Sequence, residues 1–123
     1  MATELKPIVS IEETFDKLDI RVGRVMSAEP ASSAEKPSYV IRADFGKFGR
    51  RTSIGRFTMH TPDKLIGKEI LGVLNFEPRE IGGIVSEFLT LGVQYPKAES
   101  GEAAIVTPLI EVKVGSRLFY AIC

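Results

Sequence analysis

The sequence predicts an all-β fold, a small barrel built from short strands. Short stretches of strand character recur along the chain, glycines and prolines separate them, and only two short stretches have helical character. Such a series of strands with glycines at the bends favours a barrel over a parallel α/β sheet. With 123 residues the chain has the size of one domain, so we expect residues 1–123 to form one hydrophobic core.

The first elements are a short helix and a strand. Apolar residues at i, i+4 and i+7 predict an amphipathic helix over residues 11–18, and Ser10 is placed to begin a capping box. Residues 20–26 then alternate apolar and polar side chains until the phase slips at Gly23. Glycine inside a strand pattern predicts a bulge or a sharp bend at that position.

The middle of the chain predicts a hairpin and a helical turn. Residues 30–37 (PASSAEKP) have the composition of a loop, and residues 39–45 and 50–57 have strand character on either side of a glycine-bounded turn. These two strands should therefore pair. Residues 61–65 (TPDKL) begin with a threonine and a proline, which predicts one helical turn.

The last third predicts a buried strand and a closing hairpin. Residues 69–76 (EILGVLNF) are strongly apolar, and residues 88–95 and 103–107 have strand character across a polar loop. Together with the earlier strands they supply enough short elements for a barrel.

Cysteine content and apolar runs indicate where the protein acts. The single cysteine, Cys123, has no partner for a disulfide within the chain and cannot build a metal site alone. Residues 1–10 lack the apolar region of a signal peptide, and no apolar run approaches the ~20 residues that span a bilayer. We therefore expect a cytoplasmic protein that does not insert into membranes.

Motifs for catalysis or for a cofactor are not found. His60 is the sole histidine, and a triad of Ser53, His60 and Asp63 has no nucleophile elbow around its serine. The glycine-rich loops that cradle nucleotide phosphates are also missing. The sequence thus predicts a protein without metal or cofactor that binds a partner and is not an enzyme.

Charge is distributed unevenly along the chain. The net charge is zero, but residues 36–68 carry eight basic and two acidic side chains, a net +6, and each flank sums to −3. The arginines of this basic middle either bind nucleic-acid phosphates or serve as an ordinary solvated surface. Its aromatic side chains either stack on bases or fill the barrel.

Four ordered motifs carry a resemblance to a known family. The segments are FDKLDIRVGRV (residues 15–25), KPSY (36–39) followed by DFG (44–46), NFEPREI (75–81) and SEFLTLGV (86–93). In this order they resemble the stand-alone tRNA-binding domain family, most closely its CsaA-like branch. The resemblance covers about two thirds of the chain.

The resemblance implies an OB-fold barrel of five strands, with short helices, a core over residues 19–110 and terminal extensions that pair two copies into a homodimer. It implies binding of tRNA or structured RNA without catalysis. The CsaA-like branch further implies an export-related chaperone that holds unfolded or secretory polypeptides.

Two sets of binding residues follow from the basic middle and the family motifs. The basic residues would neutralise phosphates and the polar ones would bond backbone or base edges of RNA. The predicted RNA-binding residues are Lys36, Arg42, Arg50, Arg51, Ser53, Arg56, Asn75, Arg79 and Ser86. Reversal of Arg51 and Arg56 is expected to remove most of the affinity. The alternative is a chaperone that holds polypeptide in an apolar groove of the dimer, and its predicted peptide-binding residues are Ile54, Phe57, Met59 and Phe76.

One segment departs from the family pattern. Residues 53–58 (SIGRFT) stand where family members carry a strand similar to SSAQIT, so Ile54 replaces a small polar residue and Arg56 replaces an amide. An arginine engages phosphate more strongly than glutamine does, but base selection by the amide is lost.

The terminal segments suggest self-association. Ile8 to Phe15 and Val112 to Ile122 are more apolar than free tails need to be. They either pair two copies of the chain or pack against their own barrel.

Overall fold

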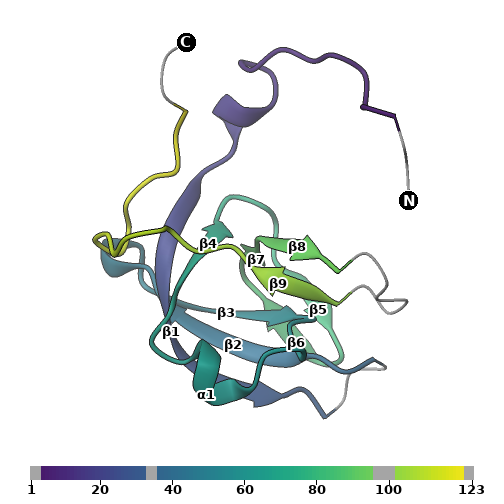
Figure 1. Ribbon diagram of the computed structural model, residues 1–123, viewed down its shortest axis with the longest axis vertical. Helices are drawn as coiled ribbons and strands as arrows, with labels where there is room; N and C mark the ends of the chain where they lie inside the picture. The colour runs from purple at the N-terminus through teal and green to yellow at the C-terminus, as the bar shows by residue number, and fades with distance from the viewer. Residues whose placement is uncertain (1–3, 33–35, 96–101, 121–123) are drawn as a thin grey trace.

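The structure is a computed structural model that describes residues 4–32, 36–95 and 102–120. Its centre is an antiparallel sheet in the order β3-β2-β1-β4-β7 (Figure 1). The strands of this sheet are β1 (Ile20–Pro30), β2 (Tyr39–Asp44), β3 (Arg50–Gly55), β4 (Glu69–Val73) and β7 (Leu89–Thr90). The paired strands β2 and β3 confirm the predicted hairpin.

The remaining elements are short. Two further hairpins flank the sheet, and the helices each cover a single turn. These elements are η1 (Phe15–Lys17), η2 (Gly46–Phe48), α1 (Pro62–Leu65), the hairpin of β5 (Arg79–Ile81) and β6 (Ile84–Ser86), and the hairpin of β8 (Gly92–Gln94) and β9 (Ala103–Ile105). No helix in the described part of the chain is long and apolar enough to span a membrane.

The sheet curls into a nearly closed barrel because β1 is long enough to serve two neighbours. Residues 24–30 of β1 pair with β2, and residues 20–24 pair with β4. The free edge of β3 is covered by Glu87, whose amide donates to the Thr52 carbonyl at 2.7 Å. The amide of Ala103 donates to the Arg56 carbonyl at 3.0 Å and extends this closure. The predicted all-β, five-stranded OB-like fold is therefore confirmed.

The core is built around Phe45, which is fully buried. Its ring meets Phe88 edge to face, with centroids 4.9 Å apart. A Cβ on Gly23 would lie 2.6 Å from the Phe45 ring, and a Cβ on Gly72 would lie 2.9 Å from it. Both glycines thus allow the ring to approach the sheet backbone.

Two local predictions differ from the structure. The bulge lies between Val25 and Ser27, where the β1–β2 register shifts, and Gly23 instead makes room for the aromatic core. The helix expected over residues 11–18 is only the 3-10 turn η1, although Ser10 Oγ accepts the predicted capping bond from Glu13 N at 3.0 Å. Ile11 is 46% exposed, so this segment has too little tertiary burial to hold a longer helix.

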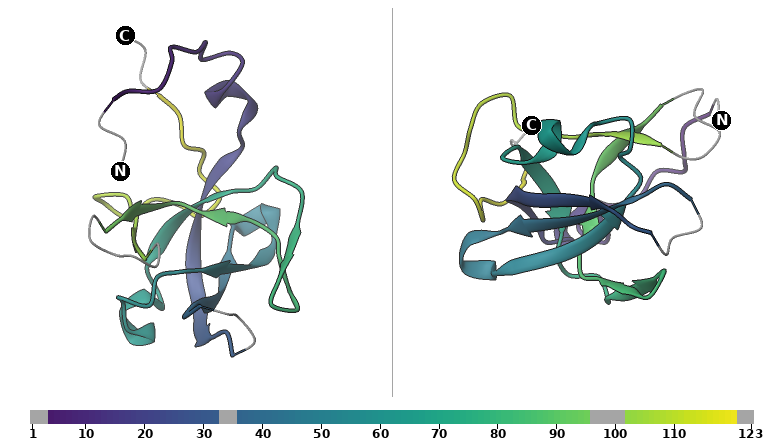
Figure 2. Two further views of the ribbon diagram at one scale, coloured as in Figure 1. Left: turned by 90° about the vertical axis from the view of Figure 1, so that its right-hand side faces the viewer. Right: turned by 90° about the horizontal axis from the view of Figure 1, so that it is seen from below.

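The two ends of the chain leave the barrel on the same side (Figure 2). The C-terminal segment first pairs with β1, where Gly115 N donates to Val22 O at 2.7 Å. It then reaches η1, and the Tyr120 ring meets Phe15 with centroids 5.4 Å apart. The N-terminal residues 4–14 extend away from the barrel and are mostly exposed.

Candidate nucleic-acid interface

The outer face of the β2–β3 hairpin presents two arginines to solvent. In an antiparallel pair, directly opposed residues point to the same face of the sheet. Arg42 is opposite Thr52, and Arg50 begins β3 opposite Asp44. The side chains of Arg42 and Arg50 are exposed and form no hydrogen bond or ion pair with the described residues.

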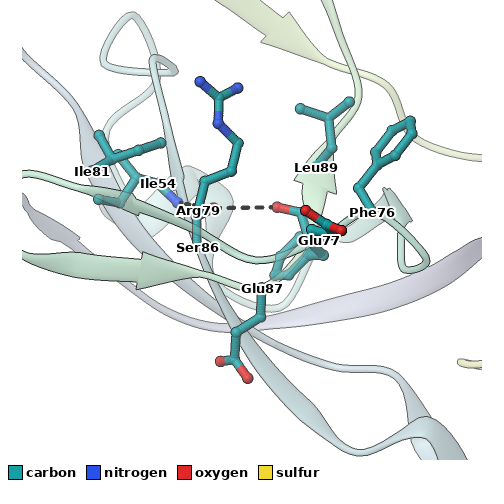
Figure 3. A pocket seen from close by; sticks show the side chains of 9 residues that line it. Ile54, Phe76, Glu77, Arg79, Ile81, Ser86, Glu87 and Leu89 are labelled. Carbon is teal, nitrogen blue, oxygen red and sulfur yellow. Dashed lines mark hydrogen bonds between the residues drawn. The ribbon is translucent and has the colours of Figure 1, made fainter.

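A pocket lies at the far end of β3, between this face and the β5–β6 hairpin. Its volume is about 390 Å³. We call it the hairpin pocket, and it is lined by Ile54, Phe76, Glu77, Arg79, Ile81, Ser86, Glu87, Phe88 and Leu89. Figure 3 shows Arg79 extended on one side of the pocket, Phe76 and Leu89 on the other, and Glu87 pointing away. The pocket therefore combines an apolar lining with one cationic side chain, Arg79, and with the acidic Glu77.

Sequence patterns did not predict the β5–β6 hairpin that forms this pocket. Its turn is Gly82-Gly83, with φ values of 58° and 82°. Two glycines with positive φ between apolar residues are a recognised signal for a two-residue hairpin turn, and here Ile81 and Ile84 flank them. The hairpin places Arg79 opposite Ser86 and so brings two predicted RNA-binding residues together.

A small hydroxyl network supports the floor of the pocket. Ser86 Oγ accepts a hydrogen bond from Ile54 N at 3.3 Å. The hydroxyls of Ser86 and Thr90 each lie 3.4 Å from Ser53 Oγ. Ser53 is 1% exposed, so its hydroxyl positions the neighbouring strands inside the barrel and does not face a ligand.

Two of the predicted RNA-binding residues bond to the protein's own main chain. Arg51 donates from Nε to Phe48 O at 3.3 Å and from a terminal nitrogen to Leu74 O at 3.4 Å. Asn75 Oδ1 accepts from Asp19 N at 2.8 Å, and its amide nitrogen donates to the Lys17 carbonyl at 2.7 Å. These side chains stabilise the entry into β1 and the turn before β3.

Arg56 is directed inward, toward a buried carboxylate. Its Nε donates to Pro37 O at 3.1 Å, and one terminal nitrogen lies 3.6 Å from Glu102 Oε1. Both terminal nitrogens are shielded from solvent and have no hydrogen-bond acceptor among the described residues. Lys36 is exposed and borders a separate depression beside Ser38.

The structure places the predicted peptide-binding residues in different surroundings. Ile54 and Phe76 share the hairpin pocket, and Phe76 is 50% exposed. Phe57 is 4% exposed and packs in the core, and it also lines a second depression together with Ile54. Met59 is exposed but does not line the hairpin pocket.

His60 has a structural role. Its Nε2 accepts a hydrogen bond from Ile105 N at 3.3 Å, and its carbonyl accepts one from the Tyr39 hydroxyl at 2.8 Å. It therefore links the loop after β3 to β9. Within the described residues, no group of three or more histidine, cysteine or acidic side chains is placed to hold a metal ion.

The fold and the outer face of the β2–β3 hairpin indicate the class of protein. It is a small OB-like barrel that carries arginines without a partner among the described residues beside a surface pocket. A sequence model described as "Putative tRNA binding domain" matches residues 20–117. The match covers most of the chain, so the chain belongs to this tRNA-binding domain family.

Relatives with curated names are longer proteins. The chain is 37% identical to a methionine–tRNA ligase of Methanoculleus marisnigri over 112 residues, which are 91% of this chain and 16% of that protein. It is 33% identical to the methionine–tRNA ligase of Pyrococcus horikoshii, with 86% of this chain and 14% of that protein covered. The chain therefore spans about one sixth of the length of these relatives.

Three similar solved structures are covered by this chain over their whole length. The CsaA chaperone from Bacillus anthracis superposes with a TM-score of 0.84 at 33% identity, covering 92% of this chain and 100% of that one. The CsaA chaperone from Picrophilus torridus gives 0.82 at 30% identity, covering 91% and 100%. A protein related to methionyl-tRNA synthetase from Pyrococcus horikoshii gives 0.78 at 26% identity, covering 93% and 100%. The CsaA-like resemblance in the sequence is therefore confirmed.

Proposed function

We propose that this chain is a non-catalytic, cytoplasmic protein that binds tRNA across the outer face of β2–β3 and the hairpin pocket. The observation that carries the proposal is the set of free cations on this side of a tRNA-binding domain. Arg42, Arg50 and Arg79 have no side-chain partner within the described residues. A guanidinium presents several donors in a planar fork that matches phosphate oxygens, so each can bind one phosphate.

The contacts of the arginines favour a different order of contribution to RNA affinity from the one that the sequence predicts. Arg51 and Arg56 already have acceptors within the protein, and binding RNA would require them to give up those contacts. Arg42, Arg50 and Arg79 form no such contacts with the described residues, so they would give up none on binding RNA. We therefore expect the exposed arginines to contribute more to RNA affinity than the two that the sequence favours.

Salt dependence tests the proposal. Each phosphate contact contributes about 0.7–0.9 to the log–log slope of affinity against salt. The variants Arg42→Gln and Arg79→Gln should each weaken tRNA binding and lower that slope by one such step. Lys64→Gln is the matched control, since Lys64 is exposed on α1 and lies outside this face. Equal slopes in all four proteins would show that RNA binds elsewhere.

A homodimer is part of the proposal because the ends of the chain expose apolar side chains. Leu5 is 99% exposed, Ile8 102% and Leu109 101%. Side chains of this kind are expected to be buried when a second copy binds. Sedimentation should show a dimer of the 13.5 kDa chain at micromolar concentration, and removal of residues 1–10 should shift the protein toward the monomer. A monomer in the full chain contradicts the dimer and leaves the RNA proposal standing.

Peptide binding is the second candidate function, favoured by the apolar lining of the hairpin pocket. Ile54, Phe76 and Leu89 could hold an apolar side chain of an unfolded or secretory polypeptide. Burial of apolar surface gives a negative heat-capacity change and little dependence on moderate salt. Calorimetry with an unfolded polypeptide should therefore separate this function from RNA binding. Phe76→Ala should weaken the peptide complex, and an unchanged affinity would exclude the pocket.

A further inference from the structure

Two glycine turns meet at the N-terminal end of β3, away from the β5–β6 hairpin (Figure 1). One turn contains η2 and the other is formed by residues 113–116. A Cβ on Gly46 would lie 3.1 Å from Val114 O, and a Cβ on Gly115 would lie 3.1 Å from Phe45 O. The two turns are therefore in backbone contact, and together they hold the side chains around them in place.

Cationic side chains gather around the ring of Phe48 between these turns. The Arg21 guanidinium lies 4.5 Å from the ring centroid and the Lys47 ammonium 5.3 Å from it. Arg21 is further held by Asp19, whose Oδ1 is 2.6 Å from Nε, and by the Gly115 carbonyl at 3.2 Å. We call Arg21, Lys47, Phe48 and Arg117 the Phe48 cluster.

Arg117 joins the cluster through the C-terminal segment. It is the antiparallel bridge partner of Arg21, so two arginines stand directly opposite each other. Like charges in this position repel each other, and the Asp19 carboxylate beside Arg21 offsets part of that repulsion. The Arg117 side chain is exposed and forms no ion pair with the described residues.

The acidic residues nearby neutralise only part of the cluster. Asp19 pairs with Arg21, Asp44 Oδ1 accepts from Gly46 N at 2.8 Å, and Glu111 lies 3.5 Å from Arg24. Lys47 and Arg117 therefore have no ion-pair partner among the described residues. Arg50, the first residue of β3 and one of the two arginines of the outer face, follows Phe48 closely along the chain.

We infer that the Phe48 cluster is a second phosphate site, which binds the sugar-phosphate backbone of the same RNA. The inference rests on the proposed tRNA binding and extends its footprint along the whole of β3. Six residues of strand span roughly 17–20 Å, which is long enough for several consecutive phosphates. RNA backbone is favoured over an acidic peptide because Arg50, an exposed arginine of the outer face, begins the strand that directly follows the turn carrying Lys47 and Phe48.

The test neutralises the cluster without touching the hairpin pocket. Lys47→Gln and Arg117→Gln each remove an exposed charge, and Lys64→Gln on α1 removes the same charge away from the cluster. Anisotropy with unfractionated tRNA between about 50 and 200 mM salt should show a slope lowered by about 0.7–0.9 for each cluster variant. The same measurement on Lys64→Gln should match the unsubstituted protein. Circular dichroism and sedimentation check that fold and association are retained.

Each outcome of this test bears on the inference. If Arg79→Gln weakens binding but the two cluster variants do not, RNA does not reach the cluster and the inference is wrong, while the proposed function stands. If Lys64→Gln lowers the slope as much as Lys47→Gln, general charge explains the effect and the site is rejected. If the unsubstituted protein does not bind tRNA, the proposed function fails and the inference fails with it.

Discussion

Replacement of Arg56 by glutamine tests whether Arg56 stabilises the fold or binds RNA. Arg56 lies beside Glu102, which is 6% exposed and accepts hydrogen bonds from the amide and the hydroxyl of Thr58. In Arg56→Gln the Glu102 carboxylate keeps both bonds to Thr58 but loses the only cation near it among the described residues. The bond from Arg56 to the Pro37 carbonyl is lost as well.

The loss of stability follows from burial and distance. Removal of one partner of a fully buried ion pair costs about 3–5 kcal/mol. Here a terminal nitrogen of Arg56 lies 3.6 Å from Glu102 Oε1, beyond hydrogen-bond range, and the Arg56 side chain is 21% exposed. The long distance and the partial exposure lower this cost, and the lost bond to Pro37 adds to it. We therefore expect the free energy of unfolding to fall by about 2–3 kcal/mol. For a domain of this length that is a fall of about 10 °C in Tm.

Urea unfolding and tRNA binding should be measured on the same variants. Arg56→Gln should be destabilised and bind tRNA nearly as well as the unsubstituted protein, whereas Arg42→Gln should show the opposite pattern. Adding Glu102→Gln to Arg56→Gln should recover part of the stability, because the uncompensated carboxylate is gone. The reasoning is refuted if Arg56→Gln keeps its unfolding free energy and loses about tenfold or more in tRNA affinity.

Three further substitutions test the packing and the ends of the chain. Gly72→Ala should cost about 1–3 kcal/mol in thermal unfolding, since the new Cβ would lie 2.7 Å from the Phe88 ring, and adding Phe88→Leu should restore part of it. Asn75→Ala should cost about 1–2 kcal/mol in urea unfolding without changing tRNA affinity, and a lost affinity would make Asn75 a ligand residue. The hydrogen bond to Asp16 raises the pKa of Tyr120 above its ordinary value of 10.0. This contact therefore stabilises the folded state below pH 10, and its contribution is lost as the pH rises through the raised pKa. Asp16→Asn should lower the pKa of Tyr120 in an NMR titration, and an unchanged pKa would mean that the two side chains do not interact.

Local patterns were sufficient for most of the barrel. The β2–β3 hairpin was predictable because alternating side chains and a glycine turn are encoded within about twenty residues of each other. The β5–β6 hairpin was missed although Gly82-Gly83 marks its turn, because its strands are only three residues long and carry little periodicity. The sequence pattern is irregular at Gly23, but the reason for a glycine there is the ring of Phe45, which directly follows β2.

The candidate site depended more heavily on tertiary structure. The sequence alone determined the all-β class, the basic middle and the family motifs, because these are properties of residue type and order. It could not decide which cations are free. Arg51 bonds to Leu74, Arg56 lies beside Glu102, and Asn75 bonds to Asp19, each partner being distant along the chain. Only the folded barrel brings such partners within reach, and so only the fold decides which charges remain to bind RNA.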